Sequence, residues 1–356
     1  MTTRQSTTAL ELNSKQVGAL HGGPLHLITL QNDHITIHIT NLGCAIMAIY
    51  TPGRNGMMKN IVAGFAHPQD YANNPWYFGC VVGRYANRIA GGRFMLDGKP
   101  VQLSVNNNNN HLHGGFEGFH TRVWTLEALL REDDRVGVVL AYTSRDGEEG
   151  YPGNLKAQVK YTLNQQNQLA ISYTAVTDKR TPVNFTNHSY FNLGGFEPPL
   201  ITDHILQVNA GHYTEKNEHN APTGRILPLA GTCADFTVAT RIGDNIHQFP
   251  QDKGFDHNYV LKQDGFSAPA AILEDPLTGR YLQVFTDRPG MQVYTANYWD
   301  GSITGQQGKA YVQHGAVALE TQAFPDSPNH AAFPNTILEP DAVYESTTVY
   351  AFGVRG

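Results

Sequence analysis

The chain has 356 residues, of which 16% are charged and 40% are hydrophobic, with a formal net charge of −6. An average soluble domain carries about 25% charged residues. The mild charge and ample apolar content exclude a disordered chain, and the low Glu and Lys content excludes a coiled coil or helical repeat. Because the pI is near 6.2 and no Lys/Arg cluster occurs, we expect no nucleic-acid partner and no membrane partner.

The cysteines and the N-terminus bear on the cellular compartment. Cys44, Cys80 and Cys233 form no disulfide framework and no zinc-binding spacing, so we expect all three to be small buried hydrophobic side chains. The opening residues MTTRQSTTAL lack the apolar region of a signal peptide, and no apolar run is long enough to span a bilayer. These features predict a cytoplasmic protein.

Alternating apolar and polar residues predict β-strands along most of the chain. Residues 35–39 alternate first, and residues 94–96 and 101–103 flank an Asp-Gly pair that favours a hairpin turn. Residues 155–163 and 169–175 keep the period of two, and no stretch longer than about ten residues shows a helical period. Many short strands predict an all-β sandwich or barrel. Further strands are expected at 204–209, 281–286, 291–296, 315–320 and 343–353.

The sequence shows no boundary between domains. Gly, Pro and Asn are spread along the whole chain, and neither a linker nor a long internal repeat is visible. We therefore predict a single domain over residues 1–356, with roughly the first 15 residues as a flexible or peripheral extension.

Five segments that lie far apart are dense in glycine and polar side chains. Such segments indicate a site in which scattered strand ends and loops converge. No nucleophile elbow, P-loop or H-E-x-x-H motif occurs, which argues against serine hydrolases, nucleotide-dependent enzymes and zinc proteases. The remaining His, carboxylate, amide and Arg side chains suit proton transfer on a neutral, hydroxyl-rich ligand. The segments are residues 83–94, 109–115, 187–195, 255–261 and 318–330.

Individual residues in these segments differ in how strongly they indicate a functional role. Glu320 follows an apolar strand-like run, where a charge is costly unless it is paired, so a functional role is as plausible as a structural one. His111 and His113 have the spacing of two ligands on one strand face, but this pair alone is weak evidence for a metal. A pair of loop histidines, one of them hydrogen-bonded to the backbone, is the favoured explanation, because titration and metal ligation need a special neighbourhood.

The arginines and the Asp-His pair also have ordinary explanations. Arg84, Arg88 and Arg93 could form a solvated face, since exposed ion pairs contribute little to stability. Asp256 and His257 could serve in a turn or a cap.

Seven segments together resemble the aldose 1-epimerase (galactose mutarotase) family, in the order of that family. The resemblance covers most of the chain, and seven ordered matches make coincidence implausible. It implies a large, single-domain antiparallel β-sandwich of the galactose mutarotase-like supersandwich type. It also implies interconversion of the α and β anomers of free aldoses such as galactose and glucose, without a cofactor or a metal. The segments are GRYANRIAGGRF (83–94), NNHLHGG (109–115), DGEEGYPGNL (146–155), NHSYFNLGG (187–195), FDHNYVL (255–261), PGMQVYTAN (289–297) and ALETQAFPDSPNH (318–330).

The resemblance implies roles for residues at matching positions. Glu320 corresponds to the catalytic carboxylate and His188 to the catalytic acid, with His113 as a second active-site histidine. Opening the sugar ring requires a proton to leave O1 and another to reach O5, which we assign to Glu320 and His188 respectively. This expectation requires an ionised Glu320 and a protonated His188 at neutral pH. The substrate-binding residues that the resemblance implies are Asn87, Arg88, His113, Asp256 and Gln292.

Other functions remain open at this point. A non-catalytic sugar-binding protein would need the binding groups but not both His188 and Glu320. The chain could also be a relative that acts on a phosphorylated sugar or on a disaccharide. A phosphate would need an added Lys/Arg cluster near the site, for which the arginines of residues 84–93 are the candidates. A glycoside hydrolase could use Asp256 and Glu320 as its two carboxylates. The preferred aldose, the choice between monomer and homodimer, and the roles of His111 and His257 stay undecided.

Overall fold

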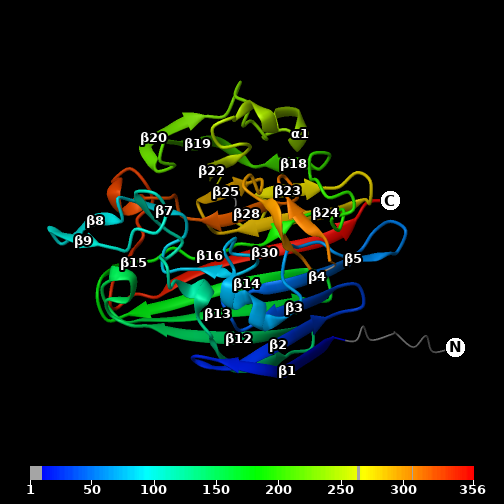
Figure 1. Cartoon of the computed structure of the whole chain (residues 1–356), viewed down its shortest axis with the longest axis horizontal. Helices are drawn as coiled ribbons and strands as arrows, with labels where there is room; N and C mark the ends of the chain where they lie inside the picture. Colours follow the sequence, from blue (N-terminus) through cyan, green and yellow to red (C-terminus); the bar gives the residue numbers. More distant parts are fainter. Residues whose placement is uncertain (1–9, 263–264, 307) are drawn as a thin grey trace.

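The computed structural model describes residues 10–262, 265–306 and 308–356 (Figure 1). Antiparallel strands are the main regular structure of this part of the chain, which confirms the predicted all-β class. The described helices are three to six residues long, and none has the length and apolar character needed to cross a membrane. They are η1 (Pro68–Asn73), η2 (Phe119–Thr121), η3 (Glu148–Gly150), α1 (Ile242–Asn245), η4 (Ile246–Gln248) and η5 (Ser327–Asn329).

A nine-stranded sheet spans the molecule. Its inner face is built by strict alternation, as in β13 (Leu155–Asn164), where every second side chain is buried and the others face outward. The C-terminal strand β30 (Tyr344–Val354) lies at the centre of this sheet. The strand order is β11 (Thr125–Arg131), β12 (Arg135–Ser144), β13, β14 (Gln168–Thr177), β30, β24 (Arg280–Thr286), β23 (Ala271–Glu274), β18 (Ile205–Val208), β21 (Thr240–Arg241).

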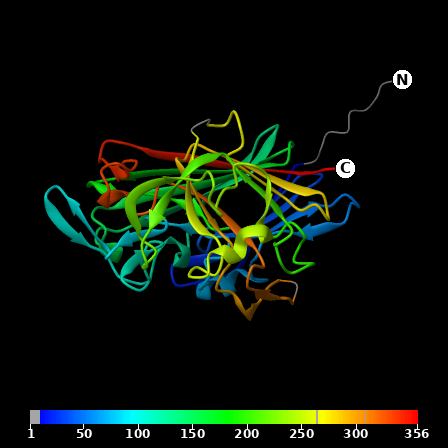
Figure 2. The ribbon, with the colours of Figure 1, turned by 90° about the horizontal axis from the view of Figure 1, so that it is seen from above.

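Two smaller sheets pack against the nine-stranded sheet. One buried apolar cluster contains side chains of all three sheets, so they share a core. Seen from above, β30 lies in the upper layer and the N-terminal strands lie below it (Figure 2). The five-stranded sheet runs β1 (Glu11–Leu20), β2 (Gly23–Gln31), β3 (Thr36–Thr40), β4 (Ile46–Pro52), β5 (Met58–Asn60); the six-stranded sheet runs β17 (Tyr190–Phe191), β28 (Val317–Gln322), β25 (Gly290–Tyr294), β22 (Asp256–Leu261), β19 (Ala210–Lys216), β20 (Pro222–Pro228).

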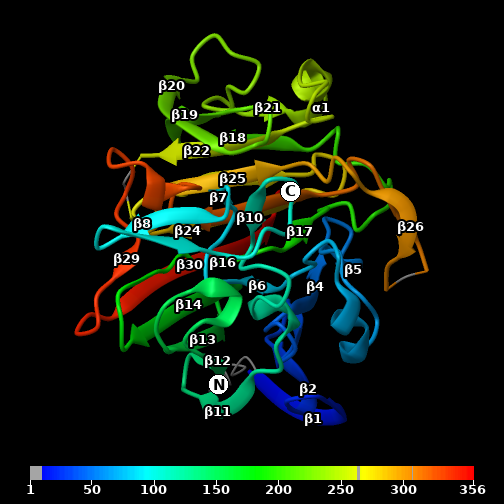
Figure 3. The same cartoon turned by 60° about the vertical axis from the view of Figure 1, so that its left-hand side comes forward.

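Short two-stranded pairs complete the fold and bring loops to one side of the six-stranded sheet. Figure 3 turns this side toward the viewer, with β7 and β10 beside β22 and β25. The pairs are β7 (Arg88–Ala90) with β10 (Asn110–Leu112), β6 (Val81–Val82) with β16 (Thr186–Asn187), β8 (Arg93–Leu96) with β9 (Lys99–Gln102), β15 (Thr181–Pro182) with β29 (Ile337–Leu338), and β26 (Asp300–Thr304) with β27 (Ala310–Val312).

The strands expected from alternation correspond to β3, β8, β9, β13, β14, β18, β24, β25, β28 and β30. The prediction that all three cysteines are buried is wrong for Cys233, which is exposed in a turn after β20, whereas Cys44 and Cys80 are buried. Residues 1–9 of the expected N-terminal extension lie outside the described residues. Residues 11–15 belong to β1, which pairs with β2 at the edge of its sheet.

Candidate active site

Three neighbouring strands of the six-stranded sheet present polar side chains on one face. In β28, Val317 and Leu319 belong to the core, so the alternation places Glu320 on the opposite face. The register pairs Glu320 with Gln292 on β25, and Gln292 with Asn258 on β22. Side chains directly opposite each other lie close together, so the three strands form a continuous polar row.

The opposite wall comes from the loops around β7 and β10. Asn87 and His113 both have left-handed backbone, with φ of 60° and 51°, which is uncommon for residues other than glycine. The His113 N–H donates to the Asn87 carbonyl at 3.0 Å, and the Asn87 N–H donates to His113 Nδ1 at 3.2 Å. Because Nδ1 accepts this bond, a neutral His113 carries its proton on Nε2. Burial, together with His188 and Arg88 nearby, holds the pKa of His113 well below its usual range.

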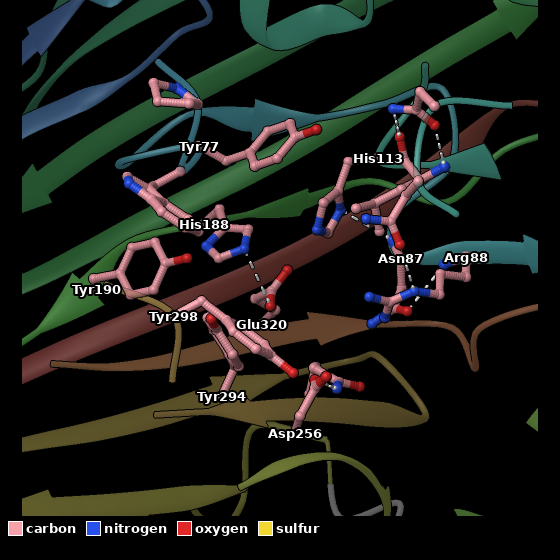
Figure 4. Close-up of a pocket in the computed structure, with 16 residues that line it drawn as sticks. Tyr77, Asn87, Arg88, His113, His188, Tyr190, Asp256, Tyr294, Tyr298 and Glu320 are labelled. Carbon is pink, nitrogen blue, oxygen red and sulfur yellow. Dashed lines mark hydrogen bonds and ion pairs between the residues drawn. The ribbon is translucent and has the colours of Figure 1, made fainter. Parts of the chain in front are cut away.

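His188 lies in the loop between β16 and β17, beside Glu320. Its N–H donates to the Cys80 carbonyl, and its own carbonyl accepts from the Gly79 N–H, each at 2.9 Å. These bonds fix the backbone, and the ring points at the carboxyl, with Nε2 3.5 Å from Glu320 Oε1 (Figure 4). Both side chains are almost fully buried, so this pair is held away from bulk water.

Burial decides the protonation of this pair in the free protein. It raises the pKa of Glu320 well above its usual range; Asp256 raises it further, whereas Arg88 opposes the shift. Burial also lowers the pKa of His188 to about 3. The negative charge of Asp256 raises this pKa but offsets only part of the shift. Both shifts oppose the expected combination of an ionised Glu320 and a protonated His188 in the unliganded protein.

Asp256 is anchored at the start of β22. Gln292 Nε2 donates to Asp256 Oδ1 at 2.6 Å, and Lys216 on β19 donates to the Asp256 carbonyl at 2.8 Å. Burial opposes ionisation of this carboxyl, but Lys216, Arg88 and other neighbours hold its pKa below the usual range. Asp256 is thus a carboxylate at neutral pH. The sequence did not point to Lys216, which lies outside the seven segments.

A cavity of about 330 Å³ brings all seven expected residues together. Its volume falls in the range of small-molecule sites. The Oε1 of Gln292 and the Oε2 of Glu320, both buried, find no hydrogen-bond partner within the part of the chain that the structure describes, so they are free to bind a ligand. The expected lining residues are Asn87, Arg88, His113, His188, Asp256, Gln292 and Glu320.

Aromatic and amide side chains that the sequence did not single out also line the cavity. The Tyr77 ring contacts His113 and lies nearly parallel to His188, with centroid distances of 4.7 and 6.0 Å. Tyr298 is 41% exposed and faces the cavity from the loop after β25. Asn106 and Asn107 shortly precede the NNHLHGG segment, and Tyr298 directly follows the PGMQVYTAN segment. Position along the chain was therefore the available signal for these three residues. The additional residues are Pro75, Trp76, Tyr77, Asn106, Asn107, Leu112, Tyr190, Tyr294 and Tyr298.

Three further candidates lie outside the cavity and hold the scaffold. His111 bonds the Ser104 carbonyl through Nδ1 and the Tyr151 hydroxyl through Nε2, each at 2.7 Å. His257 Nδ1 accepts from the Asp256 N–H, on the core side of β22. Arg84 is buried, so the solvated-face interpretation is wrong for this residue.

The same cluster has the composition of a metal site. Ligand-capable atoms of His113, His188 and Glu320 all lie within 4.8 Å of one another. The three groups can equally exchange protons with a bound molecule, since two are imidazoles and one is a carboxyl. Fold and cleft therefore place the protein among acid–base enzymes that act on small, hydroxyl-rich molecules.

Similarity to known proteins supports the assignment to this class of enzyme. A family model described as aldose 1-epimerase matches residues 26–351. Galactose mutarotase of Rattus norvegicus is 41% identical over 333 residues, 94% of this chain and 95% of that protein. Aldose 1-epimerase of Escherichia coli (strain K12) is 36% identical over 355 residues, 96% of this chain and 99% of that protein. The crystal structure of galactose 1-epimerase from Lactobacillus acidophilus NCFM has a TM-score of 0.87 at 28% identity and covers 98% of this chain and 100% of that one. The chain belongs to the aldose 1-epimerase family.

Proposed function

We propose that the chain is a mutarotase that interconverts the α and β anomers of free aldohexoses such as galactose and glucose. The observation that carries this proposal is the buried Glu320–His188 pair, 3.5 Å apart at the base of the cavity. A hemiacetal ring opens when one group takes the O1 proton and another gives a proton to O5. An acid and a base already in contact can perform both transfers without a cofactor.

Glu320 acts as the base at O1 and His188 as the acid at O5. Burial disfavours the charged forms of both groups in the free protein. Sugar hydroxyl groups that donate to the carboxylate favour the ionised form of Glu320, because hydrogen bonds to the charged form lower its pKa. The carboxylate then takes the proton from O1 while the imidazolium protonates O5. The C1–O5 bond breaks, the aldehyde rotates about C1–C2, and the reverse transfers close the ring on either face.

The remaining polar residues bind and orient the sugar. His113 donates from Nε2, because Nδ1 already accepts from Asn87. Asp256 accepts from hydroxyl groups, and Gln292 bridges it to the row that contains Glu320. Asn87 and Arg88 complete the wall opposite the sheet. Tyr77, Trp76 and Tyr298 provide apolar surface for the C–H groups of the ring.

The lining favours an uncharged substrate. Arg88 is the cation among the described lining residues, and Asp256 lies across the same cavity as a carboxylate, which disfavours a sugar phosphate. A non-catalytic sugar-binding protein would have no use for a buried carboxyl–imidazole pair. We further propose a single-domain enzyme that works in the cytoplasm, as a monomer or homodimer, on a small-molecule sugar.

Anomerisation kinetics across a panel of sugars test this function. Freshly dissolved α-galactose, α-glucose, xylose, maltose and glucose 6-phosphate are followed by polarimetry, with the spontaneous rate subtracted. We expect rapid equilibration of the free hexoses and little acceleration for the phosphate. No acceleration over the spontaneous rate by the wild-type protein would refute the proposed function, and equal rates with the wild-type protein and with Glu320→Gln would refute the role of Glu320.

A further inference from the structure

The segment after β28 runs from the Glu320 strand to the opposite wall of the cavity. Asp326 lies in this segment with only 1% of its surface exposed and with left-handed backbone at φ 58°. Such backbone is uncommon for a residue other than glycine and persists where the surroundings hold it in place. The proposed proton-transfer mechanism does not use this buried carboxyl.

Asp326 makes two backbone contacts with β7, the strand that begins with Arg88. Its own N–H donates to the Arg88 carbonyl at 2.8 Å, and its Oδ1 accepts from the Ala90 N–H at 3.0 Å. One residue thus satisfies a carbonyl and an N–H of β7, as a neighbouring strand would. β7 pairs with β10, so Asp326 supplies further bonds to this short strand.

The contact is reinforced on both sides of Asp326. The Tyr85 hydroxyl donates to the Phe324 carbonyl at 3.2 Å and accepts from the Ser327 N–H at 3.1 Å. Asn329 Nδ2 donates to Asp326 Oδ1 at 2.6 Å and to the Arg93 carbonyl at 2.9 Å. Residues 323–330 are therefore fastened to residues 85–93 at several points.

The opposite oxygen of the carboxyl is also engaged. His330 Nε2 lies 3.1 Å from Asp326 Oδ2, so the side chain cannot rotate without losing contacts on both oxygens. The Arg88 side chain is held separately, with Nε donating to Asn107 Oδ1 at 3.3 Å. Asp326 therefore acts on Arg88 through the backbone and not through a direct ion pair.

We propose that Asp326 is a positioning residue that fixes the Asn87–Arg88 wall of the cavity relative to the Glu320 strand. The proposal rests on the proposed function, in which Asn87 and Arg88 bind the sugar. Loss of the Asp326 carboxyl removes its bonds to the Ala90 N–H, Asn329 and His330, so β7 is held less firmly relative to β28 and sugar binding weakens. The proton transfer between Glu320 and His188 uses neither β7 nor Asp326, so kcat is largely preserved.

The test compares three protein variants that alter the contacts of Asp326. Asp326→Gly removes the carboxyl while tolerating the left-handed backbone, so loss of the side chain is separated from strain. Asp326→Asn keeps an oxygen for Ala90 and Asn329 and serves as the conservative rescue. Asn329→Ala weakens support for the same carboxyl without changing residue 326, and it keeps the test available if Asp326→Gly does not fold. Asp341→Gly, at an exposed aspartate, is the matched control.

Two measurements are made on each folded variant: the dissociation constant for galactose, from the fluorescence of Trp76 in the cavity wall, and the kinetic constants for anomerisation. For Asp326→Gly we expect the dissociation constant and KM to rise about tenfold, with kcat within about threefold of wild type. Asn329→Ala should shift in the same direction by a smaller factor. Asp326→Asn and Asp341→Gly should remain near wild type.

A double-mutant cycle with Arg88→Ala separates positioning from general loosening. If Asp326 acts through the β7 wall, adding Asp326→Gly to Arg88→Ala should weaken galactose binding much less than it does in the wild-type background. Unchanged binding in Asp326→Gly and Asn329→Ala, or fully additive losses, would overturn the inference. Galactose binding without anomerisation by the wild-type protein would instead refute the proposed function and leave the positioning test intact.

Discussion

Replacing Glu320 with glutamine removes the proposed base with almost no change in shape. The carboxyl is 2% exposed, and burial raises its pKa, which favours the neutral form. A neutral amide of the same size should therefore fold as well as the wild type. Equal melting temperatures for the two proteins are the first check.

The expected loss of activity follows from the surroundings of Glu320. Its Oε1 is the carboxyl oxygen that faces His188 Nε2, whereas the neighbouring carboxylate of Asp256 is bonded to Gln292. No other described carboxylate is thus placed to take over the proton transfer. A general acid or base contributes typically 10²–10⁴-fold, so kcat should fall by at least two decades, or about 2.7 kcal/mol of barrier.

Polarimetry of freshly dissolved α-galactose measures this loss after subtraction of the spontaneous rate. His188→Asn should show a similar decrease, and the double variant should be little worse than the slower single variant, because the two groups act as a unit. A kcat within tenfold of wild type in folded Glu320→Gln would refute the assignment of the base.

The other predictions concern pH and metals. The profile of kcat/KM should show no inflection near pH 6.5, the ordinary pKa of histidine, because burial lowers the pKa of His188 to about 3; an inflection there that is lost in His188→Asn would contradict this lowered pKa. Stability should decrease as the pH falls below about 6.5, since burial lowers the pKa of His120 to about 4 and the unfolded chain then binds more protons than the folded one. In urea unfolding between about pH 4.5 and about pH 6, His120→Gln should reduce the slope of unfolding free energy by about 1.4 kcal/mol per pH unit, and equal slopes would exclude this cause. Dialysis against EDTA should leave turnover unchanged, although His113, His188 and Glu320 lie close enough to share a metal; activity lost and then restored by a divalent cation would show that the ion is required.

Much of the architecture could be predicted because alternation records which face of a strand is buried. In β13 the period of two survives without interruption, so its bounds were clear from the sequence. Glu320 stood out as a charged side chain directly after the apolar run Val317-Ala318-Leu319 of a strand. The sequence pattern could not assign Cys233 to an exposed turn, since a lone cysteine carries no periodic signal.

The protonation state of the site could not be read in the same way. It depends on how completely the folded chain excludes water from Glu320 and His188, and that exclusion arises from segments far apart in sequence. Lys216 was missed because its partner Asp256 lies forty residues further along the chain. Tyr77 and Tyr298 were missed because aromatic residues in loops are as common in cores as in sites.

The central place of β30 has a consequence for synthesis of the protein. This strand is formed by the last residues of the chain, yet it lies between β14 and β24 and pairs with both. During translation, β14 and β24 therefore emerge without the strand that joins them, and each carries an unpaired edge that invites pairing with other chains. The two halves of the sheet can unite only after β30 has been made and has left the ribosome. The newly made chain should accordingly depend most on chaperone protection between the emergence of β24 and that of β30.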